Sequence, residues 1–376
     1  MPSSPSASPT SNDSSATREP RVASRGMRLL LRRFSGSCGA QSASGAWPMR
    51  TGLLVELRLG SLRGLGEASP LPGYSPDSIE ESAQALGALN IAALEAAMHI
   101  EPTRAALRAV AQLLPRSLPA ARMAMETAAL DLLARQRDLP AAALLGAEPG
   151  ARRPLAYLLG TPGPYGLEVT SQAKLAGYQH FKIKLGRAGH FDTELAAVRE
   201  LRRTLGALPR LRLDANQAWS QAEAQAACTL LEPLDIEFIE EPCKPLTGAF
   251  RSPVPLALDE SRQGLQAEEL ETLARCTGAS VVVLKPMVLG GLSDCLDLAG
   301  RARSLGLAVI ISHSFDGPVA LLSAAALARA LPSRAAQGLA PHPGLRAWPE
   351  VPLPIVDGAL QGWSSPGLGL APEQFL

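Results

Sequence analysis

Five short stretches in the second half of the chain decide its fold: FKIKLG at 181–186, LRLDANQAW at 211–219, IEFIEEP at 236–242, LALDES at 256–261 and VVLKP at 282–286. Each is an apolar run that meets charged residues at its end. Amphipathic stretches with helical spacing separate these runs, as TELAAVRELRRTL does at 193–205. A strand and a helix alternating every ~20–30 residues form the unit of a parallel sheet with crossover helices.

Three further runs share this rhythm: PLAYLLG at 154–160, AVIIS at 308–312 and QGLA at 337–340. They bring the expected strands to about eight, which favours a closed (β/α)₈-type TIM barrel over a doubly wound open sheet. No GxGxxG follows a strand, so a dinucleotide-binding fold is also disfavoured. The fold class that we expect is therefore α/β, with the barrel as the catalytic domain.

The chain divides into segments of different character. Residues 1–26 are rich in Ser, Pro and Ala and are expected to be a disordered tail, or to lie upstream of a start at Met27. Residues 27–150 are expected to form a separate α+β domain, and residues 151–349 the barrel. Residues 350–376 are expected to pack back on the α+β domain.

Local patterns predict individual elements of the α+β domain. GLLVELRLG at 52–60 indicates a strand, and the Gly/Ser-rich SGSCGAQSASGA at 35–46 before it indicates a loop. Ser75 or Asp77 is placed to cap the next helix. MAMETAALDLLARQ at 123–136 has the apolar spacing of a helix.

Composition narrows the class of function. The 36 basic and 35 acidic residues give a net charge of +1, which offers no electrostatic footprint for nucleic acid or an anionic membrane. No apolar run is long enough to span a bilayer. Five cysteines without CxxC spacing argue against a disulfide scaffold or a zinc site and suit a reducing cytoplasm. A small-molecule substrate is expected, and either a monomer or a homo-oligomer is compatible with the sequence.

Charged side chains at the ends of apolar strands are the main functional signal. An unpaired charge on a buried strand costs several kcal/mol, so chance placement is disfavoured. The carboxyl ends of TIM-barrel strands meet at one mouth. Three carboxylates there would repel one another without a cation, and oxygen ligands suit Mg²⁺. The six residues are Lys182, Lys184, Asp214, Glu240, Asp259 and Lys285.

The lysines indicate proton-transfer chemistry. Lys182 and Lys184 lie two apart on one strand and point the same way. Neighbouring positive charges should lower a lysine pKa and allow it to act as a general base. Lys285 lies on a strand further round the mouth. A cation would stabilise the enediolate formed when a proton is lost next to a carboxylate. His313, after a strand end, is a weaker candidate for substrate contact.

With these motifs in place, the sequence resembles the enolase superfamily, and within it the muconate-lactonizing-enzyme subgroup. The KxK, Asp-Ala-Asn, Glu-Glu-Pro, Asp-Glu-Ser and Lys-Pro motifs occur in order, and the likeness runs from Met27 onward. Sites of that superfamily combine a Lys or His base with Mg²⁺. The resemblance implies an enolase-like fold with a barrel and an N-terminal capping domain.

The resemblance also implies residue roles. Asp214, Glu240 and Asp259 would bind Mg²⁺, for which Mn²⁺ could substitute, and Glu240 is preferred to Glu241 as the first acidic residue of Glu-Glu-Pro. Lys184 would remove the proton, and Lys285 would face the opposite side of the substrate. Supporting or substrate-binding positions are Lys182, Arg212, Asn216, Ser312 and Ser314.

A closer likeness is to the o-succinylbenzoate synthase family, carried by GEASPLPGYSPDSIEES, LRLDANQAW, EFIEEPCK and SHSFDGPVALLSAAALA. It implies Mg²⁺-dependent syn-dehydration of 2-succinyl-6-hydroxy-2,4-cyclohexadiene-1-carboxylate through an enediolate, a step of menaquinone biosynthesis catalysed by a carbon–oxygen lyase. The loop at 35–46 would then close over the succinyl tail. The SFDGP segment departs from the Ser-x-Glu-Ser of some relatives.

Other functions stay open. The same residues would serve an N-succinylamino acid racemase, a dipeptide epimerase or a cycloisomerase, since lysines on opposite faces suit a racemase. The eighth-strand segment QGLAPHPGLRAWP lacks the Asp-x-Asp typical of dipeptide epimerases. An inactive barrel that only binds a partner is disfavoured because no ligand or lysine of the pattern is missing.

Overall fold

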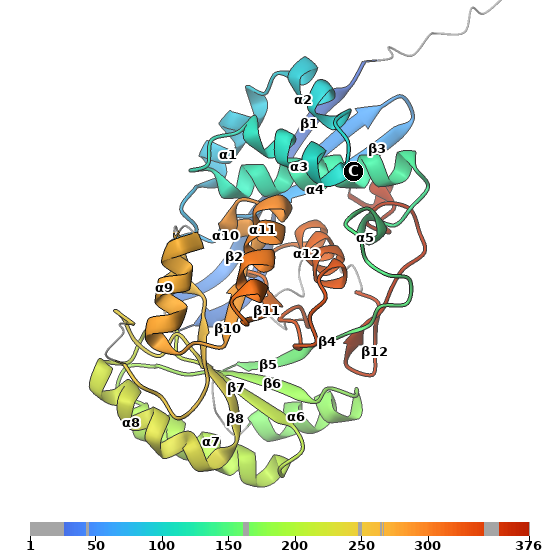
Figure 1. Ribbon diagram of the computed structural model, residues 1–376. Helices are drawn as coiled ribbons and strands as arrows, with labels where there is room; N and C mark the ends of the chain where they lie inside the picture. Colours follow the sequence, from blue (N-terminus) through green and yellow to red (C-terminus); the bar gives the residue numbers. More distant parts are fainter. Residues whose placement is uncertain are drawn as a thin grey trace, which may run out of the picture.

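The computed structural model describes residues 26–42, 45–160, 165–246, 250–263, 265, 267–341 and 353–375, and the tail expected at 1–26 lies almost wholly outside them. Figure 1 shows an N-terminal layer of strands and helices above a curled parallel sheet. Within the described residues, no helix is both long and apolar enough to cross a membrane.

The N-terminal layer is an antiparallel sheet covered by helices. Strands β1 (Arg28–Ser42), β2 (Gly45–Leu59) and β3 (Leu62–Ala68) pair in sequence order. The long helix α4 packs closely on β3, because Gly64 and Gly66 let its backbone approach the strand. The helices are α1 (Ile79–Gly87), α2 (Ile91–Met98), α3 (Thr103–Gln112), α4 (Pro119–Gln136) and α5 (Ala141–Leu144).

Two local expectations for this layer are wrong. The segment 35–46 is not a loop, because β1 continues to Ser42 and β2 begins at Gly45, so that most of it belongs to a hairpin. Cross-strand pairing supplies the backbone partners that the Gly/Ser composition alone does not predict. The cap of α1 is Ser78, whose hydroxyl accepts from the N–H of Glu81 at 3.2 Å. Asp77 instead accepts from the N–H of Ala120 at the start of α4, at 2.9 Å.

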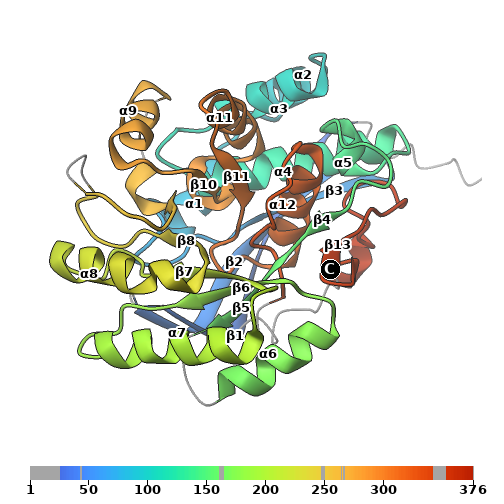
Figure 2. The same ribbon diagram turned by 60° about the horizontal axis from the view of Figure 1, so that its bottom comes forward.

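The second layer is a parallel seven-stranded sheet in the order β11-β10-β9-β8-β7-β6-β5. Its strands are β5 (Ala156–Gly160), β6 (His180–Lys184), β7 (Arg210–Asp214), β8 (Ile236–Glu240), β9 (Leu256–Leu258), β10 (Val281–Leu284) and β11 (Ala308–Ile311). The helices α6 (Tyr165–Leu175), α7 (Phe191–Leu205) and α8 (Gln221–Leu231) cover one outer side, as Figure 2 shows. The remaining barrel helices are α9 (Ala267–Thr277), α10 (Pro286–Leu289), α11 (Leu292–Ser304) and α12 (Pro318–Ala330).

The expected eighth strand closes the sheet through isolated bridges. Gln337 bridges Leu155 beside β5, and Gly338 bridges Ser312 beside β11. The N–H of Gly338 donates to the carbonyl of Ile311 at 2.8 Å. These contacts join both edges of the sheet, which confirms the α/β barrel class with an N-terminal capping layer. No helix occurs among the described residues between β8 and β9.

Two buried carboxylates of the capping layer cap helices of the barrel. Glu126 on α4 accepts from the N–H of Leu292 and, at 3.0 Å, from the N–H of Ser293, at the start of α11. Glu67 on β3 accepts from the N–H groups of Gly317 at 2.6 Å and Val319 at 3.1 Å, at the start of α12. These contacts satisfy helix-terminal donors and hold the two layers together.

The C-terminal segment contacts both layers. Strands β12 (Ile355–Val356) and β13 (Ala359–Leu360) form a small sheet with β4 (Arg153–Pro154). Further on, Asp131 of α4 accepts from the N–H of Leu368 at 2.7 Å, and Arg135 donates to the carbonyl of Leu370 at 2.7 Å. The short 3₁₀ helix η4 (Pro372–Phe375) lies against β3.

Candidate active site

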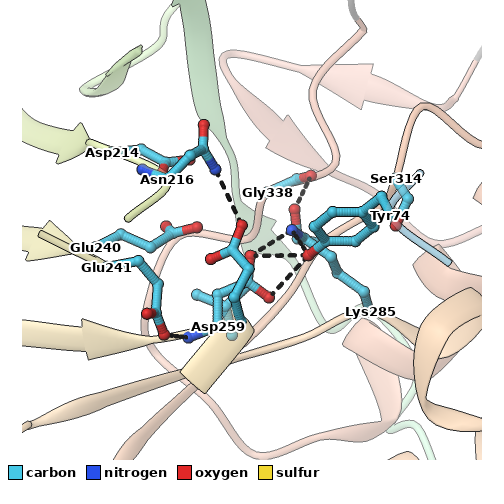
Figure 3. Close-up of polar contacts among 12 residues, drawn as sticks. Tyr74, Asp214, Asn216, Glu240, Glu241, Asp259, Lys285, Ser314 and Gly338 are labelled. Carbon is cyan, nitrogen blue, oxygen red and sulfur yellow. Dashed lines mark hydrogen bonds and ion pairs between the residues drawn. The ribbon is translucent and has the colours of Figure 1, made fainter. Parts of the chain in front are cut away.

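The charged residues at the strand ends lie side by side because the strands are parallel and in register. Lys184 on β6 pairs in register with Asp214 on β7, which pairs with Glu240 on β8. Asp259 follows the end of β9, and Lys285 follows the end of β10. Parallel strands present their carboxyl ends at one edge, so these five side chains gather at one mouth, and Figure 3 shows the carboxylates among them.

Lysines are the direct partners of the first two carboxylates. The Nζ of Lys182 lies 2.8 Å from Asp214 and 2.7 Å from Glu240, and the Nζ of Lys184 lies 2.7 Å from Asp214. All of these groups are shielded from solvent to a large extent, and both carboxylates are fully buried. Charge is therefore balanced locally by alternating ammonium and carboxylate groups.

The pKa values reflect this packing. Burial alone would lower the pKa of Lys182, but the charges of Asp214 and Glu240 outweigh burial and raise it. The nearest charges of Lys182 are therefore carboxylates and not other cations. Burial, followed by the charge of Asp214, raises the pKa of Glu240 to about 7.

The other side of the mouth is built around Lys285. Its Nζ forms an ion pair with Asp259 and donates a hydrogen bond to the hydroxyl of Tyr74 at 2.7 Å. Burial opposes its charge, yet Asp259 raises the pKa of Lys285 well above the usual value. Since β6 and β10 are separated by three strands in the sheet order, Lys184 and Lys285 project from opposite walls.

Glu241 is enclosed by hydrogen-bond donors. It accepts from the N–H of Asp259 at 2.7 Å, the N–H of Ser261 at 2.9 Å, the hydroxyl of Ser261 at 2.6 Å and the amide of Gln217 at 2.8 Å. Its backbone lies in the left-handed region, with φ of 45°. The side chain therefore holds the segment after β9 in place, and Figure 3 shows it beside Asp259. Glu240, in contrast, accepts hydrogen bonds from Lys182.

The supporting residues have separate partners. Asn216 accepts from the Nζ of Lys184 at 2.9 Å and donates to Glu260 at 3.1 Å. Arg212 is held by Glu237 at 2.8 Å and by the carbonyl of Ala336 at 2.7 Å, which fixes its guanidinium at the floor of the mouth. Two nitrogens of the Arg212 guanidinium donate to the two carboxylate oxygens of Glu237, which is a bidentate ion pair.

The two serines differ. The hydroxyl of Ser312 donates to the carbonyl of Gly338 at 3.2 Å, which ties β11 to the eighth segment. The hydroxyl of Ser314 is buried and has no hydrogen-bond partner among the described residues. Of the two hydroxyls, only that of Ser312 therefore has a structural hydrogen bond among the described residues.

These residues surround one pocket at the junction of the two layers. Lys182, Lys184, Arg212, Asn216, Glu240, Lys285, Ser312, His313 and Ser314 line it, and so do the apolar or aromatic Trp47, Leu71, Tyr74, Leu158, Phe238, Ile310 and Phe315. Asp214 and Asp259 lie beneath the lining, in contact with the lysines. The pocket therefore combines charged groups at its base with an apolar wall, as binding sites for small molecules commonly do.

From the sequence, we expected the segment 35–46 to close over the substrate, but we did not identify the capping-layer residues that line the pocket, which are Trp47, Leu71 and Tyr74. Trp47 from β2 lies 5.9 Å from Phe315, ring centre to ring centre, and its indole donates to the carbonyl of Pro72 at 3.0 Å. Tyr74 comes from the loop after β3. The only signal was the turn-rich GYSPDS segment, which gives no information about the distant strand that it contacts.

The carboxylates of Asp214, Glu240 and Asp259 have the oxygen atoms that a hard divalent cation prefers as ligands. The three carboxylates are buried oxygen donors on adjacent strand ends, and their negative charges repel one another: after burial, the charges of Asp214 and Asp259 raise the pKa of Glu240. In the described residues, however, no three His, Cys, Asp or Glu side chains are close enough to hold one ion as they stand. Their present partners are the lysines, so an ion would have to replace some of these ion pairs.

Comparison with known proteins places this geometry in a family. Residues 167–375 match the family described as enolase C-terminal domain-like. Residues 40–146 match the mandelate racemase / muconate lactonizing enzyme N-terminal domain. The chain belongs to the enolase superfamily. Its two matched segments correspond to the barrel and to the capping layer.

Individual relatives agree with this assignment. The chain is 30% identical over 324 residues to the o-succinylbenzoate synthase of Yersinia pseudotuberculosis serotype O:1b (strain IP 31758), a match that covers 82% of this chain and 88% of the relative. It is 26% identical to a muconate lactonizing enzyme from Pseudomonas fluorescens, with a TM-score of 0.79 over 94% of this chain and 99% of that one. An N-succinyl Arg/Lys racemase from Bacillus cereus shares the fold, with 19% identity and a TM-score of 0.79 over 93% and 96% of the two chains.

Proposed function

We propose that this chain is an o-succinylbenzoate synthase, which removes water from 2-succinyl-6-hydroxy-2,4-cyclohexadiene-1-carboxylate. The observation that carries the proposal is the likeness to a synthase of that name along 82% of the chain. The pocket supports it with lysines on opposite walls and an apolar wall around a buried charged base. Menaquinone biosynthesis is the pathway that this activity would serve.

In this proposal Lys184 works on one face of the substrate ring. Its neutral amine takes the proton from the carbon that bears the carboxylate, and the electron pair of that bond moves into the carboxylate as an enediolate. The pair then returns to form the ring double bond and expels hydroxide from the neighbouring carbon. The ammonium of Lys184 protonates that hydroxide on the same face, so the net loss is one water.

The other residues fix the charges around this step. Asp214, Glu240 and Asp259 would hold Mg²⁺, or Mn²⁺ in its place, which when bound stabilises the negative charge of the enediolate. Lys285 would hold its positive charge against the opposite face. Lys182 bridges Asp214 and Glu240 and would keep them oriented. Arg212, Asn216, Ser312 and Ser314 would shape or contact the bound substrate.

The test is direct. Purified protein with Mg²⁺ should convert the cyclohexadiene to o-succinylbenzoate, followed by absorbance, and Lys184→Ala should abolish turnover. Lys174→Ala, on α6 and outside the pocket, is the matched control and should keep wild-type activity. Full turnover by Lys184→Ala would contradict the assigned base.

A second candidate is N-succinylamino acid racemase, which the opposed lysines also suit. A shared fold with the Bacillus cereus racemase is the observation that keeps it in view. Wild-type protein that racemises N-succinyl amino acids without dehydrating the cyclohexadiene would favour it. The same assay series covers the epimerase and cycloisomerase alternatives with their own substrates.

A further inference from the structure

Tyr74 reaches the catalytic mouth from the capping layer. A tight turn sets its position: the N–H of Tyr74 donates to the carbonyl of Leu71 at 3.0 Å, and the N–H of Leu71 donates to the hydroxyl of Ser75 at 2.9 Å. The indole of Trp47 donates to the carbonyl of Pro72, inside the same turn, at 3.0 Å. The loop is therefore anchored within the capping layer before it meets the barrel.

The phenol of Tyr74 contacts both charged groups on that wall. Its oxygen accepts from the Nζ of Lys285 at 2.7 Å and lies 3.5 Å from each carboxylate oxygen of Asp259. The same Nζ lies 4.7 Å from the centre of the Tyr74 ring, within range of a cation–π interaction. Figure 3 shows the three side chains converging.

The two partners of Lys285 differ in charge. Asp259 neutralises the ammonium, so it weakens the field that the lysine can direct at a substrate. Tyr74 is neutral and accepts a hydrogen bond, so it fixes the direction of the ammonium and leaves its positive charge in place. Among the described residues, these two are the hydrogen-bond partners of the Nζ of Lys285.

We infer that Tyr74 is a positioning residue: its hydroxyl aims the Lys285 ammonium at the substrate, and thereby couples the seating of the capping layer to catalysis. The inference rests on the proposed function, in which Lys285 faces the anionic intermediate. Tyr74 itself takes no proton in this scheme. Its contribution is realised when negative charge develops beside Lys285.

The experiment compares Tyr74→Phe with wild type and with Tyr178→Phe. Tyr178 is a buried tyrosine packed on Tyr157 at 5.1 Å between ring centres, outside the pocket. Loss of the hydrogen bond to a charged group should lower the kcat of Tyr74→Phe by about 10–100-fold and leave KM within about twofold. Tyr178→Phe should keep both constants. Unchanged melting temperatures show that the variants are folded.

Action through Lys285 is tested in a Lys285→Arg background. If Tyr74 acts by aiming the lysine, Tyr74→Phe should lower kcat much less in that background than in wild type. An equal loss of kcat in both backgrounds would overturn the inference. So would a normal kcat in Tyr74→Phe, or a raised KM with a normal kcat, which would indicate direct contact with substrate.

If wild-type protein does not dehydrate the cyclohexadiene, the proposed function fails before any variant is compared. In that case the wild-type protein and the variants are assayed by exchange of the α-proton of N-succinyl amino acids in D₂O. Lys184 and Lys285 face opposite sides, so each should exchange one enantiomer. Tyr74→Phe should slow exchange of the enantiomer whose exchange Lys285→Ala abolishes, and it should spare the other enantiomer. Equal slowing of both enantiomers would overturn the inference.

Discussion

The carboxylate of Glu241 accepts a hydrogen bond from the backbone N–H of Asp259 at 2.7 Å. Neighbouring acidic residues at the end of β8 thus have different surroundings. Glu240 faces the lysines of the mouth, while Glu241 turns away and binds the segment that carries Asp259. The second residue orients a proposed metal ligand on the next strand.

Glu241→Gln should therefore weaken Mg²⁺ binding. The amide N–H₂ of glutamine cannot accept a hydrogen bond, so some of the N–H and O–H groups that now donate to the Glu241 carboxylate would lose their acceptor. Asp259 should then lose its fixed orientation. We expect the affinity for Mg²⁺ to fall by about 10–100-fold, measured as the Mg²⁺ dependence of turnover. Glu223→Gln, in the capping box of the surface helix α8, is the control. An unchanged affinity in Glu241→Gln would contradict the orienting role.

Mg²⁺ should also stabilise the folded protein through Asp214. A ligand that binds only the folded state at one hundred times its Kd adds about 2.7 kcal/mol to the free energy of unfolding. Mg²⁺ should raise the melting temperature of wild type, and Asp214→Asn should remove this response. Asp192→Asn, at the exposed start of α7, should keep it. A Mg²⁺ response that survives in Asp214→Asn would place the ion elsewhere.

Glu126 should make stability depend on pH. Burial raises its pKa to about 7 despite its hydrogen bonds to Ser293 and Leu292, whereas an unfolded Glu titrates near its ordinary value of about 4.3. Between these values the folded state binds more protons than the unfolded state, so Glu126 costs stability as pH rises through this window. Below the window both states are protonated and the cost disappears.

The variant Glu126→Gln isolates this effect. Glutamine stays neutral, so the melting temperature of the variant minus that of wild type should increase from about pH 4.5 to about pH 7.5. Thermal unfolding across this range measures it, and Glu101→Gln, an exposed residue, should show no such trend. A difference that is constant with pH would show that Glu126 keeps an ordinary pKa.

The contact between β3 and α4 should tolerate no added side chain at Gly66. A Cβ there would overlap the carbonyl of Ala124 in the backbone of α4. Because this carbonyl belongs to the backbone of α4 and cannot rotate away as a side chain could, we expect Gly66→Ala to lower the free energy of unfolding by about 3 kcal/mol. Gly87→Ala, at the exposed end of α1 with open space around it, should be neutral or slightly stabilising. Denaturant unfolding of both variants measures the difference.

Local pattern was sufficient for the barrel and for most of its charged residues. A lysine stands at the carboxyl end of each of two short strands, Lys184 at the end of β6 and Lys285 directly after β10, and this placement indicated a mouth. Spacing by two predicted that Lys182 and Lys184 share a face, and both line the pocket. These features depend on neighbours along one strand, which a sequence displays directly.

Contacts between distant segments were decided only by the tertiary structure. The strands that contain most of 35–46 depend on pairing between β1 and β2, and the parallel sheet closes through bridges at Gln337 and Gly338. Tyr74 meets Lys285 across 211 positions of the chain, and Glu126 meets Ser293 across 167. Such pairs leave no periodic pattern in the sequence, because the free energy that favours them arises from burial and hydrogen bonding after the two layers have docked.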